Sequence, residues 1–83
     1  MVHQCETPED FKAKVASGTT IVDFTATWCG PCKQIAPFFS DLSEKYKTVQ
    51  FIKVDVDELE NLAGEVGVSA MPTFMVFKVT DGW

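Results

Sequence analysis

The sequence predicts a small α/β domain in which helices cover both faces of a mixed, mostly parallel sheet. Two apolar runs rich in β-branched residues, 21–27 and 49–56, have the composition of buried strands. After each run, apolar residues recur at helical spacing. Strands that alternate with helices favour parallel pairing through helical crossovers, so the expected element order is β-α-β-α-β-α-β.

Size and charge limit the classes of function. The 83 residues suffice for one domain, and 46% hydrophobic with 23% charged residues is a globular composition. A net charge of −5 argues against nucleic acid or an anionic membrane surface as the partner. The polar opening, 1–6, resembles no secretory signal, and three cysteines do not form an even disulfide framework, so a reducing cytoplasm is expected.

The first helix has the clearest start in the chain. A short strand over 2–4 precedes Thr7, which is expected to cap the helix. Pro8 suits the first helical position, and the acidic Glu9 and Asp10 suit the first turn. A helix therefore begins directly after Thr7.

The central strand and the second helix follow. The run 21–27 is preceded by two threonines, and the strand is expected to end at Trp28. The helix is expected over 32–47, bent at the internal Pro37. Its buried face consists of apolar residues at helical spacing: Ile35, Phe38, Phe39, Leu42 and Tyr46.

The last third of the chain contains two more strands. The run 49–56 is expected to be buried, and 73–79 is expected to form the final strand after a loop over 69–72. Asp81-Gly82 is a turn signal. A short third helix lies between the strands, with its apolar face made of Leu59, Leu62, Ala63 and Val66.

Two cysteines separated by two residues lie where the central strand gives way to the second helix. Such a pair closes a small disulfide ring, which makes it a redox switch. Backbone N–H groups and the positive end of the helix dipole favour a thiolate at Cys29, the predicted nucleophile. Cys32, about one turn further on, is predicted to resolve the mixed disulfide. Gly30 and Pro31 shape the turn between them.

The sequence resembles the thioredoxin family. The resemblance rests on Trp28-Cys29-Gly30-Pro31-Cys32, on the preceding strand with Asp23, and on Met71-Pro72-Thr73 before a later strand. It runs through the whole chain and stops short of the family's last strand and helix. We therefore expect residues 1–83 to form one thioredoxin-like domain, incomplete at its C-terminus.

The resemblance implies a thiol–disulfide oxidoreductase that reduces protein disulfides through Cys29 and Cys32. The Gly-Pro pair is similar to that of the reducing members of the family. No bound cofactor is expected, because a thioredoxin reductase would supply the electrons. The alternatives are a truncated binding module and an inactive fragment.

The resemblance also assigns residues around the cysteines. Asp23 is expected to be a buried carboxyl that exchanges a proton with Cys32 through water, against the alternative of an edge-strand acid that reaches solvent. Lys53 is expected beside this acid in an electrostatic role, against a plain solvated lysine. The implied substrate-binding residues are Trp28, Gly30, Pro31, Met71 and Pro72.

Three further expectations depend on position. The Met71-Pro72 bond is expected to be cis and to lie beside Cys29, with the Met71 backbone offering an edge to a bound peptide. Without the resemblance, a trans bond would be the ordinary expectation. The indole N–H of Trp28 has Asp57 as a candidate partner.

The remaining cysteine and histidine have no counterpart in the motif. Cys5 is expected to be buried and inert, with an exposed thiol that links two chains as the alternative. A metal site made of His3, Cys5, Cys29 and Cys32 is disfavoured, because the first two lie far from the pair in sequence. No metal is therefore expected.

The strand 73–79 is expected to present an unpaired edge if it is the last strand of the sheet. Self-association through this edge, with residues 81–83 at or near the contact, would cover it. The partners expected overall are disulfide-containing proteins, the reductase and a second copy of the chain.

Overall fold

The computed structural model describes residues 1–79, and the predicted turn at 81–82 lies outside them. The predicted order of strands and helices is confirmed. The strands are β1 (Val2–Cys5), β2 (Thr19–Thr25), β3 (Gln50–Asp55) and β4 (Thr73–Lys78). The helices are α1 (Pro8–Val15), α2 (Gly30–Lys45) and α3 (Glu60–Val66).

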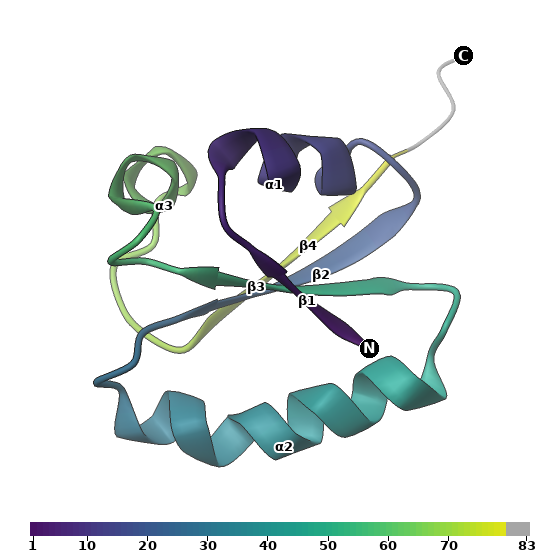
Figure 1. The fold of residues 1–83 in the computed structure, drawn as a ribbon, viewed down its shortest axis with the longest axis horizontal. Helices are drawn as coiled ribbons and strands as arrows, with labels where there is room; N and C mark the ends of the chain where they lie inside the picture. The colour runs from purple at the N-terminus through teal and green to yellow at the C-terminus, as the bar shows by residue number, and fades with distance from the viewer. Residues whose placement is uncertain (80–83) are drawn as a thin grey trace.

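The four strands form one mixed sheet in the order β1-β3-β2-β4. β3 pairs in parallel with both β1 and β2, and β4 is antiparallel to β2. Helix α2 covers one face of the sheet, and α1 and α3 lie over the other (Figure 1). The expected fold class, a mostly parallel sheet between helices, is therefore confirmed.

The two faces of β2 have different roles because side chains alternate along a strand. Val22 and Phe24 are fully buried in the core cluster that also contains Phe11 of α1. The rings of Phe11 and Phe24 lie 6.4 Å apart. Asp23 lies between them in sequence and therefore faces the opposite side, where α2 packs. The same alternation thus builds the core and brings one carboxylate under α2.

Helix α1 begins as predicted. The Thr7 hydroxyl accepts the backbone N–H of Asp10 at 3.0 Å, and Pro8 occupies the first turn. The other end is fixed by Gln50, whose amide nitrogen donates to the carbonyl oxygens of Lys14 and Ser17 at 2.8 and 2.6 Å. These bonds fix the position of α1 above the sheet.

Two predicted boundaries near the cysteines are wrong. β2 ends at Thr25 rather than at Trp28, and α2 begins at Gly30 rather than at Cys32. The backbone N–H of Cys29 donates to the carbonyl of Ala26 at 3.2 Å, which closes a turn directly after the strand. This turn makes Cys29 the N-cap of α2, so the helix includes both residues between the cysteines.

Candidate active site

A disulfide joins Cys29 to Cys32 at the N-terminus of α2, with the two Cα atoms 5.3 Å apart. The Cys29 sulfur occupies the capping position and accepts the backbone N–H of Cys32 at 3.2 Å. Cys29 is 4% and Cys32 2% exposed, so the two residues hardly differ in exposure. What distinguishes them is the helix terminus, whose N–H groups and dipole favour negative charge on Cys29.

Trp28 directly precedes Cys29 and is largely exposed. Its side chain is 66% exposed, and its indole N–H donates to Asp57 Oδ2 at 2.8 Å, as predicted. Asp57 is held by Asp55, whose Oδ1 accepts the backbone N–H of Asp57 at 2.8 Å. Sequence reasoning missed Asp55, although an Asp-x-Asp directly after a strand is typical of a turn in which the first carboxylate accepts a backbone N–H.

The Met71-Pro72 peptide bond is cis, as the family resemblance implied. Met71 packs against the small buried cluster of Ala26, Cys29 and Cys32. The loop before β4 therefore meets the turn after β2, although about forty residues separate them in the sequence. Both segments contribute to the surface around the disulfide.

Asp23 is fully buried, and neither of its carboxylate oxygens has a hydrogen-bond partner within residues 1–79. Burial raises the pKa of this carboxyl, and the positive charge of Lys53, its partner in the register of β2 and β3, opposes the rise. The alternative of an edge-strand acid that reaches water is wrong, because β2 lies between β3 and β4.

A pocket of 210 Å³ opens next to the buried face of the disulfide. Cys32 and Lys53 both line it, together with Thr27 and Asp55. Lys53 therefore connects two parts of the site, since it also pairs with Asp23 in the sheet. A pocket of this size, with polar side chains such as Lys53 and Asp55 in its lining, has room for water next to Cys32.

Replacing Asp23 with asparagine is expected to stabilise the protein increasingly as pH rises. Above the ordinary carboxyl pKa of 3.8, the unfolded wild-type chain loses this proton while the folded protein, with its raised pKa, retains it. Wild-type stability then falls with pH by up to about 1.4 kcal/mol per pH unit until the raised pKa is passed. The uncharged amide of the Asp23→Asn variant does not titrate, so this loss is absent.

Urea unfolding of both proteins at several pH values above 4 measures the difference. Because every other titrating group is shared, the difference in unfolding free energy between the two isolates Asp23. A difference that stays constant with pH would show that the carboxyl titrates alike in the folded and unfolded chains.

Cys5 lies apart from the disulfide, in the core cluster on the α1 side of the sheet. It is a free thiol with no exposed surface, so the expectation of a buried cysteine is confirmed. The alternative of an exposed thiol at this position is wrong for the folded protein, because Cys5 has no exposed surface. The four-ligand set with Cys29 and Cys32 is likewise not assembled, because these cysteines belong to separate clusters.

A Cys-x-x-Cys disulfide caps the N-terminus of a helix directly after a central strand of the sheet. This arrangement defines a thiol–disulfide oxidoreductase. The thioredoxin family model matches residues 2–82. The chain belongs to the thioredoxin family, and its members are protein-disulfide reductases.

The most similar relatives include two mammalian thioredoxins. That of Equus caballus is 51% identical over 81 residues, which cover 94% of this chain and 77% of the horse protein. That of Homo sapiens is 52% identical with the same coverage. The solved structure of Plasmodium falciparum thioredoxin superposes with a TM-score of 0.89 at 42% identity, covering 92% of this chain and 76% of that one.

Proposed function

We propose that Cys29 is the attacking thiolate and Cys32 the resolving thiol in the reduction of protein disulfides. The Cys29 sulfur attacks one sulfur of the substrate disulfide, and the other substrate sulfur leaves as a thiolate. The Cys32 thiolate then attacks the Cys29 sulfur, which forms the Cys29–Cys32 bond and releases the second substrate thiolate. The position of Cys29 as the N-cap of α2 is the observation that carries this assignment.

Asp23 is proposed to accept the proton of Cys32 through water before the second step. Its burial, its two oxygens without partners and the pocket beside Cys32 support this role. A carboxyl whose pKa is raised by burial is a better base near neutral pH than an ordinary one. Lys53 is proposed to oppose this rise and so to adjust the pKa of the carboxyl.

The substrate is proposed to bind across the surface around the disulfide. Trp28 is exposed there, and Gly30 leaves open space where a side chain would lie. The residues proposed to contact substrate are Trp28, Gly30, Pro31, Met71 and Pro72. An exposed aromatic beside open backbone suits an extended peptide that carries a disulfide.

A thioredoxin reductase is proposed to regenerate the dithiol, so that no cofactor is bound to the chain itself. We place this cycle in the cytoplasm, in the maintenance of cellular redox balance. Within residues 1–79, no helix combines the length and apolar content needed to cross a membrane.

Brief iodoacetamide treatment of the reduced protein near neutral pH is expected to label Cys29 first. We expect a severalfold preference over Cys32, up to roughly tenfold, because the helix N-terminus stabilises negative charge on Cys29 by about 1 kcal/mol. Peptide mass spectrometry measures labelling at each cysteine, and the buried Cys5 provides an internal control for unfolding. Faster labelling of Cys32 would reverse the assigned roles.

We also propose that two copies associate through β4. Phe74 and Val76 lie on the same face of β4 and are exposed. Phe74 also borders a 240 Å³ hollow that is lined entirely by apolar residues of β2, β3, β4 and α2. Within residues 1–79, no strand pairs with the outer edge of β4, so a β4 strand from a second copy could pair there and extend the sheet.

Size exclusion with light scattering is expected to give the mass of a dimer under reducing conditions. Val76→Lys places a charge on the edge and is expected to shift the protein to a monomer. Asn61→Lys, an equal change of charge on α3 at the opposite face, is expected to have no effect. A monomeric wild type would exclude this association.

A further inference from the structure

Three side chains that bind metals in other proteins converge between β1 and α1, away from the redox disulfide. His3 and Cys5 are two residues apart in a strand, so both point to the same face of β1. Asp10 lies in the first turn of α1, directly after the loop that joins the two elements. One ligand atom of each residue lies within 4.8 Å of the others.

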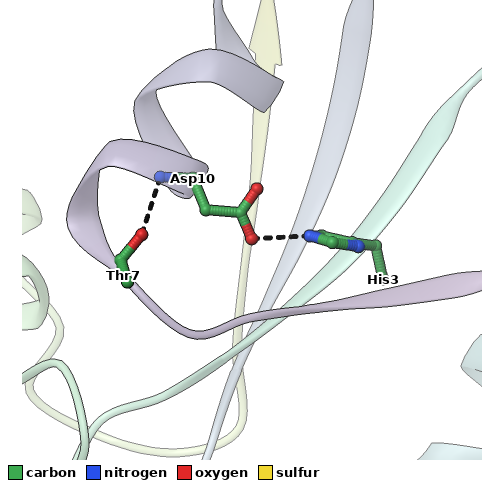
Figure 2. Close-up of polar contacts among 3 residues, drawn as sticks. All are labelled: His3, Thr7 and Asp10. Atoms are coloured by element: carbon green, nitrogen blue, oxygen red, sulfur yellow. Dashed lines mark hydrogen bonds and ion pairs between the residues drawn. The ribbon is translucent and has the colours of Figure 1, made fainter.

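The local structure positions these groups independently of any metal. His3 Nε2 and Asp10 Oδ2 lie 2.6 Å apart, and the backbone N–H of Asp10 is bonded to the cap residue Thr7 (Figure 2). Cys5 is paired in the sheet with Val54 and is fully buried below them. The imidazole and the carboxylate are partly exposed, so an ion could reach the group from their side.

We propose that His3, Cys5 and Asp10 form a zinc site, with water as the fourth ligand. Imidazole, thiolate and carboxylate are the side-chain ligands that zinc prefers, and a set of three leaves one position open. Tetrahedral zinc holds its ligand atoms roughly 3.5 Å apart. The His3 and Asp10 atoms, now 2.6 Å apart, therefore move apart, and any separation longer than about 3.5 Å shortens, by rotation of the two partly exposed side chains. Zinc then replaces the direct contact between His3 and Asp10.

Zinc binding at this site requires Cys5 to lose its proton. Burial raises the pKa of its thiol to about 11, and the nearby charge of Asp10 acts in the same direction. The thiol is therefore protonated, and zinc has to displace that proton when it binds. A dication between Cys5 and Asp10 reverses the local electrostatics, because it attracts both the thiolate and the carboxylate.

The oxidised protein offers a clean test, because the Cys29–Cys32 disulfide leaves Cys5 as the single thiol among three cysteines. Titration with Co²⁺ is expected to produce a sulfur-to-cobalt charge-transfer band, which Zn²⁺ then abolishes by displacement. Zinc is also expected to raise the melting temperature, because it binds only the folded arrangement.

Variants assign the ligands. Cys5→Ser is expected to lose the band, and His3→Ala and Asp10→Asn are each expected to weaken zinc binding by at least the roughly 10–100-fold that loss of a supporting partner costs. Asp10→Asn leaves the cap intact, since the cap bond uses the backbone. Glu9→Gln, the same change of charge one residue earlier on an exposed position, is the matched control and is expected to bind zinc as the wild type does.

The site does not depend on the proposed redox function. A Cys29→Ser/Cys32→Ser double variant is therefore expected to keep the band. Absence of a band in the wild type, or its persistence in Cys5→Ser, would overturn the proposal. Wild-type zinc affinity in both His3→Ala and Asp10→Asn would also overturn it. Both side chains are partly exposed, so the fold is expected to tolerate these substitutions.

Discussion

Replacing Cys29 with serine is expected to lower the reduction of insulin disulfides to the rate seen without protein. A hydroxyl at the N-cap of α2 still accepts a backbone N–H, so the helix start is preserved. It cannot form an S–S bond with the substrate, however, and the first step of the cycle is lost. The assay follows the turbidity of reduced insulin with dithiothreitol as the electron source.

Two further cysteine variants test the other steps of the proposed cycle. Cys5→Ser is expected to retain activity, because Cys5 lies in a different cluster from the redox pair. Cys32→Ser is expected to form the first bond and then stop, so a mixed disulfide between Cys29 and substrate accumulates and appears on a non-reducing gel. Full activity in Cys29→Ser would remove this residue from the mechanism.

Replacing Phe24 with alanine is expected to cost about 3–5 kcal/mol of unfolding free energy. Phe24 is the largest of the fully buried side chains, and its ring packs against Phe11 of α1. Truncation leaves a cavity between the central strand and this helix. Since a domain has only about 5–15 kcal/mol in total, the variant is expected to be partly unfolded at 37 °C.

Urea unfolding at 25 °C measures this loss, and Phe38→Ala provides the control. Phe38 is 58% exposed on α2, so its truncation is expected to cost about 1 kcal/mol or less. Equal losses in the two variants would contradict the assignment of the core to the face of β2 that α1 covers.

Local signals determined the type and order of the elements. The capping threonine, the proline and the acidic first turn specify the start of α1 without help from distant residues, because capping bonds span only three or four positions. The apolar runs specify β2 and β3 because both strands are buried. The boundary between β2 and α2 was predicted wrongly, since the turn closed by Ala26 and Cys29 ends the strand early.

The redox pair was also predicted from the sequence. Two cysteines separated by two residues lie where a strand is followed by a helix, and the N-terminus of a helix favours a thiolate. The cis bond before Pro72 is different. The residues alone favour trans, so only the resemblance to a family predicted it, and the structure contains it.

Tertiary structure alone decided which distant residues meet. The sheet order brings Met71 to Cys29 and sets Lys53 beside Asp23, two contacts that the family resemblance implied and the residues alone did not. It also buries the Asp23 carboxylate without a hydrogen-bond partner within the described residues. The packing of α1 against β1 brings His3, Cys5 and Asp10 together. The spacing of these residues carries no signal for such contacts, because they depend on the crossover of whole elements and on which face each side chain occupies.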